Sequence, residues 1–347
     1  MTVLSHRFGE TTVAKLSDPS ELKKVLVDPW LEAETIVIKP NFVSTDPGYA
    51  TDPEALRALL EALDSRVVVT EAHMVPRSMS LMEGGMSFTV EGKEVNWMWL
   101  MGGEGWKWQM DNPDWGWFRE GGHWEQIRRE EEAFLDERGF TDLFDEFGVE
   151  YVNVTDEVWS GSIADPADVK EAVETRFSPA FTERLYAMMP KRLYDLRGST
   201  FISFAKMQNY ASFTLKNVFG LIPDPVRGWW HGPGDSRIAS SIVDINKVYS
   251  SLFDVYGVCE TLCTNPVKDP EGDIVNVLGT RYRVVEGTGV VAFGRDLVSL
   301  DAIFCDLAGL DVKQFGGYID VAGEEFGGYD REALEESKMK IGGWLSH

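Results

Sequence analysis

The chain has 347 residues, 44% of them hydrophobic, and a formal net charge of −24. This length suits one large α/β unit or two domains, and the apolar content is enough for a full core. The acidic charge disfavours general nucleic-acid binding and attachment to an anionic membrane, because both need a basic surface. A small anionic ligand stays compatible with it, since a binding site needs only local positive charge.

No stretch has signal-peptide character or the roughly 18 apolar residues of a membrane span, so we expect a cytoplasmic protein. The cysteines Cys259, Cys263 and Cys305 form an odd set, which argues against a disulfide framework. We interpret them as small buried hydrophobic residues, and the Cys-x-x-x-Cys spacing of the first two leaves a metal or cluster as the alternative.

The first element that the pattern predicts is a buried strand at 34–39, a short apolar and β-branched run. A helix follows, with Thr51 or Asp52 as a candidate cap, Pro53 at its first position and a leucine stripe behind them. A second strand is expected at 66–70, which completes a parallel βαβ unit. Ligands bind at the carboxyl ends of such strands, where this unit places Lys39, Asn41, Thr70 and Glu71.

The α/β pattern breaks between residues 79 and 148, a stretch that is rich in glycine and tryptophan. Its acidic part at 125–147 looks helical. We expect an insertion here, between an N-terminal α/β segment at 1–78 and a C-terminal segment at 149–347 that completes the core. Three interpretations stay open: a small aromatic-packed subdomain, a lid or wall over an active site, or an oligomer interface. More than half of the chain's 12 tryptophans lie in this stretch: Trp97, Trp99, Trp106, Trp108, Trp115, Trp117 and Trp124.

The α/β pattern then resumes and predicts an α/β fold with a mostly parallel sheet and flanking helices. Apolar runs indicate further strands at 150–154, 199–205, 254–259 and 289–293. Helical periodicity indicates helices at 165–174, 180–189, 238–253 and 296–307, the last with Asp296 as its cap.

A lysine close to an asparagine ends or follows an apolar run twice in this chain, at Lys39-Pro40-Asn41 and at Lys216-Asn217. Lysine supplies a cationic donor, and asparagine supplies both a donor and an acceptor. This equipment suits a phosphate or a carboxylate. Proline stops the strand ladder, so we expect Lys39 to point toward a crevice, with a solvated lysine as the alternative.

The second Lys-Asn pair lies in a segment that is dense in polar side chains and rich in glycine and proline, so we expect loops that wrap a ligand. His231 can act as a general acid or base near neutral pH, although a loop histidine without a role is the alternative. A desolvated lysine can become a base or a Schiff-base nucleophile. The polar set spans 26 residues: Lys206, Gln208, Asn209, Lys216, Asn217, Arg227 and His231.

Four segments together resemble the DUF362 family, a group of largely uncharacterised α/β proteins. They are 36–42 with the following Thr-Asp-Pro-Glu, 206–231, 254–260 and 289–311. The Leu-Lys-Asn-x-Phe-Gly-x-Ile-Pro stretch within the second is the most specific. The family is similar at a distance to the catalytic domain of nickel-pincer lactate racemases, which implies a two-lobed α/β enzyme with a cleft.

The chain departs from the family pattern at several points. Gln208 stands where the family usually has a histidine, and 261–266 replaces an expected glycine-rich stretch. A ferredoxin-like module and cluster cysteines, which many relatives carry, are not found in the sequence. These departures weigh against a histidine-metal or iron–sulfur role, and we assign no metal and no named cofactor.

We therefore expect an enzyme that acts on an anionic small molecule by lysine and histidine acid–base chemistry, such as isomerisation, elimination or condensation. The expected catalytic residues are Lys206, Lys216 and His231, and the expected ligand contacts are Lys39, Asn41, Gln208, Asn217, Arg227 and Asp301. Asp301 or Glu260 would orient a cationic partner.

Two other functions stay open. One is a non-catalytic metal or cofactor carrier, with Cys259, Cys263, His231 and Glu260 as the candidate ligands. The other is a partner in a complex, a homo-oligomer included, that docks through its tryptophans.

Overall fold

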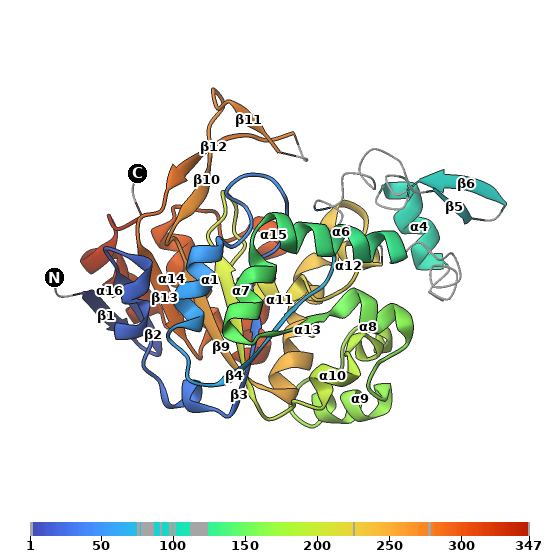
Figure 1. Ribbon diagram of the computed structural model, residues 1–347, viewed down its shortest axis with the longest axis horizontal. Coiled ribbons are helices and arrows are strands. Elements are labelled where there is room, and N and C mark those ends of the chain that lie inside the picture. The colour runs from blue at the N-terminus through green and yellow to red at the C-terminus, as the bar shows by residue number, and fades with distance from the viewer. Residues whose placement is uncertain are drawn as a thin grey trace.

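The computed structural model describes residues 3–74, 77, 87–90, 92–96, 99, 102–111, 124–224, 226–276 and 279–345. Its centre is an eight-stranded mixed sheet in the order β1-β2-β13-β9-β8-β3-β4-β7 (Figure 1). Neighbours from β9 to β7 pair in parallel, and those from β1 to β9 pair antiparallel. The strands of this sheet are β1 (Leu4–Phe8), β2 (Thr11–Lys15), β3 (Thr35–Lys39), β4 (Arg66–Glu71), β7 (Glu150–Asn153), β8 (Thr200–Lys206), β9 (Asp254–Glu260) and β13 (Val290–Gly294).

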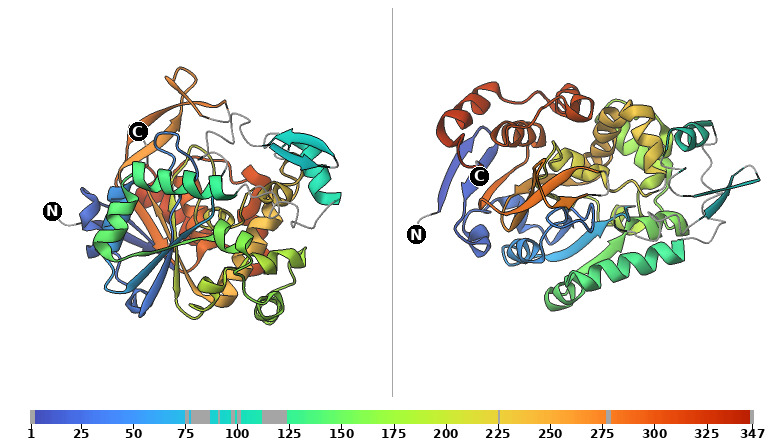
Figure 2. Two further views of the ribbon diagram at one scale, coloured as in Figure 1. Left: turned by 45° about the vertical axis from the view of Figure 1, so that its right-hand side comes forward. Right: turned by 90° about the horizontal axis from the view of Figure 1, so that it is seen from above.

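Helices cover both faces of the sheet, as the view from above in Figure 2 shows. One face carries α9 (Pro166–Glu174), α11 (Thr214–Phe219), α13 (Ile238–Leu252), α14 (Leu297–Leu307) and α15 (Gln314–Phe326). The other carries the 3-10 helix η1 (Pro19–Lys24), α1 (Pro53–Leu60), α6 (Trp124–Glu137) and α7 (Phe140–Phe147). The described helices also include η2 (Pro29–Glu32), α4 (Gly103–Asp111), α8 (Val154–Ser160), η4 (Glu183–Met188), α10 (Lys191–Tyr194), α12 (Arg227–His231), η5 (Pro233–Asp235) and α16 (Arg331–Ile341).

Side chains alternate between the two faces of the sheet along each strand, which explains why helices cover both faces. Val37 of β3 packs into the core on the α13 side, and its neighbours Ile36 and Ile38 pack into the core on the α1 side. All three are fully buried. A strand with several consecutive apolar residues needs a hydrophobic layer on both faces, and here helices supply both layers.

The predicted βαβ unit is confirmed. β3 and β4 pair in parallel, and α1 connects them with Asp52 as its N-cap residue and Pro53 at its start. The carboxyl ends of β3 and β4 therefore lie side by side, as the sequence predicts for Lys39 and Glu71. The fold class is α/β with flanking helices.

Several predicted elements differ in detail. The predicted helix at 180–189 is the 3-10 helix η4, which Thr182 caps by accepting a hydrogen bond from the amide of Arg184. The segment at 206–231, which we expected to be loops, holds the short helices α11 and α12. The expected strand at 289–293 is β13, but it pairs antiparallel with both of its neighbours.

Antiparallel elements are among the parts that the sequence did not predict. β1 and β2 form a hairpin at one edge of the large sheet. A three-stranded arm extends from the body in Figure 1, and a two-stranded hairpin lies beside α4. Their strands are β10 (Thr264–Lys268), β11 (Ile274–Val275) and β12 (Arg281–Glu286) in the arm, and β5 (Ser87–Val90) and β6 (Lys93–Asn96) in the hairpin.

The glycine- and tryptophan-rich stretch is described only in part, and Trp97, Trp115 and Trp117 lie outside the described residues. Its helix α4 contacts α12 and η5. Trp99 and Trp108 have ring centroids 6.3 Å apart and pack against the core. Across the described residues, none of the helices has the length and apolar character needed to cross a membrane.

Candidate functional site

The two Lys-Asn segments meet at the carboxyl end of β3. Lys39 Nζ donates a hydrogen bond to Asn217 Oδ1 at 2.9 Å, and Asn217 Nδ2 donates to the Lys39 carbonyl oxygen at 3.0 Å. Asn217 Nδ2 also donates to Ser203 Oγ on the neighbouring strand β8 at 3.1 Å. The asparagine of the second segment therefore holds α11 against the end of the first.

Lys39 is buried, with 2% of its surface exposed. Its ammonium forms an ion pair with Glu71 Oε2 at 2.8 Å and donates to the Pro40 carbonyl oxygen at 2.9 Å. Together with Asn217, these partners use the three N–H donors of the group. Burial lowers the pKa of Lys39 to about 8, against the opposing effect of Glu71. The lysine expected to face a ligand is thus bonded within the protein.

Asp301 holds the N-terminus of α11 in place. Its carboxylate accepts hydrogen bonds from the backbone amides of Thr214 and Leu215 at 2.9 and 3.0 Å and from Thr214 Oγ1 at 2.5 Å. These are amides at the start of α11, which have no partner within the helix. Burial raises the pKa of Asp301 to about 7. We had expected Asp301 to orient a cationic partner, and its partners are instead the donors of a helix N-terminus.

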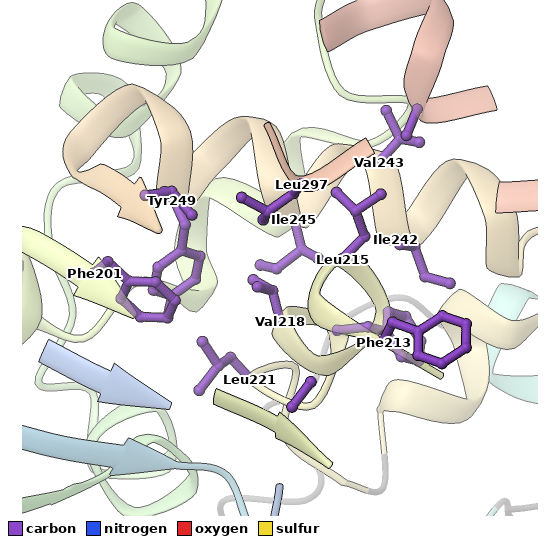
Figure 3. Packing of buried hydrophobic residues seen from close by; sticks show 14 of the residues in the cluster. Phe201, Phe213, Leu215, Val218, Leu221, Ile242, Val243, Ile245, Tyr249 and Leu297 are labelled. Atoms are coloured by element: carbon purple, nitrogen blue, oxygen red, sulfur yellow. The ribbon is translucent and has the colours of Figure 1, made fainter. Parts of the chain in front are cut away.

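One face of α11 is part of the hydrophobic core. Figure 3 shows Leu215 and Val218 of α11 facing Ile242 and Ile245 of α13, with Phe213 just before the helix. This packing fixes the rotation of the helix about its axis. Lys216 and Asn217 then project from the other side, toward the strand ends and the loops beyond them.

Lys216 lies among aromatic rings. Its Nζ is 4.4 Å from the ring centroid of Phe315 and 5.7 Å from that of Tyr210. Within the described parts of the chain, no hydrogen bond or ion pair reaches this ammonium. Burial, with added repulsion from Arg227 and Lys39, lowers the pKa of Lys216 to about 8, and Asp235 opposes the shift.

His231 is the last residue of α12 and pairs with Asp235, whose charge acts on Lys216. Its Nδ1 lies 2.9 Å from Asp235 Oδ1, and its ring packs edge-on against Phe219 with centroids 5.2 Å apart. Both His231 and Lys216 lower the pKa of Asp235, with the hydrogen bond from His231 as the largest cause. Asp235 therefore contacts the histidine directly and acts on the lysine through its charge.

Two residues that act on or contact Lys216 have an unusual backbone conformation. Asp235 and Phe315 have φ values of 58° and 51°, and no other described non-glycine residue has a positive φ. A bulky residue such as phenylalanine rarely adopts this conformation. Such strain tends to cluster at functional sites, where the surrounding structure holds it. Here the Phe315 ring contacts the Lys216 ammonium, and Asp235 acts on it through its charge.

Arg227 is buried, and its guanidinium group bonds to other residues of the protein. It donates to the carbonyl oxygens of Ile222, Gly220 and His73 and pairs with Asp224 Oδ2 at 3.3 Å. It acts on Lys216 through its charge.

Lys206 belongs to a neighbouring group on the side of β8 that faces α1. Its Nζ donates to Asp52 Oδ2 at 2.5 Å, to the Ala50 carbonyl oxygen at 3.0 Å and to Thr264 Oγ1 at 3.1 Å. The side-chain amides of Asn41 and Gln208 both donate to the carbonyl oxygen of Tyr49. These expected site residues hold the loop between β3 and α1 in place.

The sequence did not reveal a buried network next to Lys39. Glu131 of α6 accepts from Arg77 at 2.7 Å and from the Tyr151 hydroxyl at 2.5 Å, and lies 3.0 Å from His73 Nδ1. Burial alone would raise the pKa of Glu131, but Arg77, His73 and Tyr151 together lower it to about 2. Glu131 lies in an acidic helix where its neighbours are also glutamates, so no local signal singles it out.

A metal carrier built from Cys259, Cys263, His231 and Glu260 was one alternative. Among the described residues, no three histidine, cysteine, aspartate or glutamate side chains come together in a group that could hold a metal ion. His231 ends α12, whereas Glu260 ends β9.

One comparison with known proteins found a match. The model of a family described as "Domain of unknown function (DUF362)" matches residues 110–306, which is more than half of the chain. No curated protein and no solved structure matches at a significant level.

Proposed function

The chain belongs to the DUF362 family, and from that premise we propose that it is an enzyme that transfers protons on a small anionic molecule, with Lys216 as the central amine. The proposal goes beyond the family, whose description names no function. It depends on one observation above all. Lys216 is a partly buried amine with a lowered pKa, and no described group forms a hydrogen bond or ion pair with it.

The charges around Lys216 support an anionic ligand. Lys39 pairs with Glu71 and Arg227 pairs with Asp224, while His231 pairs with Asp235. Lys39 and Arg227 each have a counter-ion within the described structure, and His231 has a carboxylate partner. Lys216 adds a positive charge that no carboxylate of the described residues contacts, and a substrate carboxylate or phosphate would balance it.

The lowered pKa suits proton transfer. With a pKa of about 8, roughly one tenth of the Lys216 amine is neutral at pH 7, against less than one thousandth for an ordinary lysine. A neutral amine can remove a proton from a carbon next to a carboxylate or carbonyl, and its pKa lies near the operating pH, as general-base catalysis requires. The same amine could add to a carbonyl with loss of water, giving a Schiff base.

His231 is the proposed second proton-transfer group. Asp235 holds its Nδ1 and so orients the ring, an arrangement common to catalytic histidines. The contact of α4 with α12 and η5 brings the tryptophan-rich segment next to this pair. We propose that this segment forms a wall of a cleft between two lobes and shields the amine from water.

Hydrogen–deuterium exchange tests the proposal. Pyruvate, L-lactate, L-malate and glycolaldehyde phosphate would be incubated with the protein in D2O, and loss of the carbon-bound proton followed by NMR. We expect exchange in at least one compound, abolished by Lys216→Met. Lys216→Arg should retain binding, seen as thermal stabilisation by the compound, and lose exchange, because arginine keeps the charge without a neutral form.

Lys338→Met is the matched control, because Lys338 is an exposed lysine on α16 paired with Asp306 and Glu335. It should leave exchange unchanged. If a carboxylate or phosphate binds equally well to wild type and to Lys216→Met, the lysine is not the anion site and the proposal fails.

A further inference from the structure

Three buried side-chain oxygens close to Lys206 have no hydrogen-bond donor. They are Gln208 Oε1, Glu260 Oε1 and Asn265 Oδ1, and within the described residues nothing donates to them. Gln208 is 2% exposed, and Glu260 and Asn265 are fully buried. A buried acceptor without a donor costs about 1–3 kcal/mol, more if it is charged. Three such acceptors on residues around the ends of two neighbouring strands point to a shared partner.

The three residues surround one stretch of backbone. Glu260 of β9 is the ladder partner of Lys206, and its carbonyl oxygen accepts from the Met207 amide at 3.0 Å. Asn265 Nδ2 donates to the Met207 carbonyl oxygen at 3.2 Å, and Gln208 is the next residue along the chain. All three therefore lie around the carboxyl ends of β8 and β9.

The orientation of both amides is determined by their neighbours. Gln208 Nε2 donates to the carbonyl oxygens of Tyr49 at 2.9 Å and Lys206 at 3.4 Å, and Asn265 Nδ2 faces the Met207 carbonyl. Turning either amide over would set its oxygen against another oxygen. The unpaired atoms are therefore acceptors, and their missing partner is a donor or a cation.

The charges leave one negative charge uncompensated by a direct contact. The three hydrogen bonds of Lys206 go to Ala50, Asp52 and Thr264, so none reaches Glu260. Lys206 and Asp52 neutralise each other. Glu260 has one oxygen bonded to the Leu262 amide at 2.6 Å, and its other oxygen is unpaired.

We propose that Gln208, Glu260 and Asn265 bind a small monovalent cation, K⁺ or Na⁺, through these three oxygens. Hard cations prefer carboxylate and amide oxygens. One carboxylate matches a single positive charge, whereas a divalent ion beside the Lys206 ammonium would need more acidic ligands. The site is separate from the Lys216 group and does not depend on the function proposed for it.

A proton on Glu260 is the competing occupant. Burial raises the pKa of Glu260 to about 7, against the opposing effect of Lys206. A proton supplies only one donor, so it leaves at least one of the three oxygens unpaired.

Thermal unfolding at pH 8 in KCl, NaCl or choline chloride of equal ionic strength tests the inference. We expect a Tm at least about 2 °C higher in one alkali salt than in choline chloride, with saturation as the salt concentration rises. In crystals soaked with Tl⁺, which replaces K⁺, an anomalous peak should lie between the three oxygens. Equal Tm values in all three salts, or a Tl⁺ soak without that peak, would overturn the inference.

Glu260→Gln provides the matched variant, since its amide can donate to a neighbouring oxygen without a cation. It should be insensitive to the choice of salt, whereas Glu271→Gln between β10 and β11 should respond as wild type does. If Glu260→Gln does not fold, the wild-type salt series and the Tl⁺ soak still decide. An infrared band of a protonated carboxyl group at pH 8, absent from Glu260→Gln, would also count against the cation.

Discussion

Lys39 and Asn217 lie 178 positions apart in the sequence and bond to each other twice, side chain to side chain and side chain to backbone. This pairing joins the end of β3 to α11 and so brings Lys216 to the carboxyl edge of the sheet. Lys39 is therefore a structural residue that is bonded within the protein. Lys216, next to Asn217, is the lysine for which we propose a function.

Removing the buried ammonium should destabilise the protein. In Lys39→Met, the fully buried Glu71 carboxyl group would lose its cationic partner. We expect a loss of about 3–5 kcal/mol in the free energy of unfolding, measured by urea denaturation. Lys24→Met, which removes the exposed pair with Glu21, should change it by less than about 1 kcal/mol.

The double variant Lys39→Met/Glu71→Gln identifies the cause. Neutralising Glu71 removes the unpaired charge, so the double variant should be more stable than Lys39→Met alone. Equal stability of the two would show that lost packing outweighs the buried charge.

The Lys216 amine should react at a lower pH than other lysines. Its rate of acetylation, followed by mass spectrometry of peptides, should rise through a midpoint near pH 8, because only the neutral amine reacts. Lys313, whose pKa is raised by its exposed pair with Asp320, provides the contrast. A Lys216 midpoint above pH 10 would contradict the proposed role.

Asp235→Asn should change that midpoint in a defined direction. Asp235 raises the pKa of Lys216, so removing its charge should lower the midpoint below that of wild type. The shift should be a fraction of a pH unit, because Asp235 is about half exposed and solvent screens its charge. Asparagine tolerates positive φ, so the turn should persist. A higher midpoint would mean that Asp235 does not act on Lys216.

Local patterns predicted the parallel part of the fold. β3, α1 and β4 could be read from an apolar run, a proline after a capping residue and a second apolar run. The strand β13 was also predicted, but its antiparallel direction was not, because the direction of pairing depends on which strand lies beside it. α11 has six residues and begins without a capping side chain of its own, since Asp301 supplies that cap from 87 positions away.

The buried polar residues were also predictable only in part from the sequence. Residue type and position at a strand end singled out Lys39, and they suggested a solvent-facing crevice. Its burial follows from Glu71 and Asn217, and only the folded chain shows that both reach it. Glu131 gave no signal at all, because an acidic helix usually faces water, whereas this one buries the Glu131 side chain.

Glu131 should make a large contribution to the acid sensitivity of the protein. Its pKa in the folded state is about 2, below the ordinary value of 4.5, because Arg77, His73 and Tyr151 outweigh the effect of burial. A carboxyl group with a lowered folded pKa stabilises the fold above its unfolded pKa, and this stability is lost as the pH falls toward the folded pKa. The shift corresponds to a contribution of about 3 kcal/mol, lost between roughly pH 5 and pH 2.

Urea denaturation of wild type and Glu131→Gln across this range measures the contribution. The variant should be less stable at pH 7, because Arg77 loses its buried counter-ion, and its stability should fall less between pH 5 and pH 2. Glu146→Gln is the matched control, since Glu146 also pairs with an arginine, Arg57, but at the surface. It should reproduce the wild-type pH profile. If Glu131→Gln loses as much stability on acidification as wild type, the acid sensitivity arises elsewhere and the network around His73 is not its source.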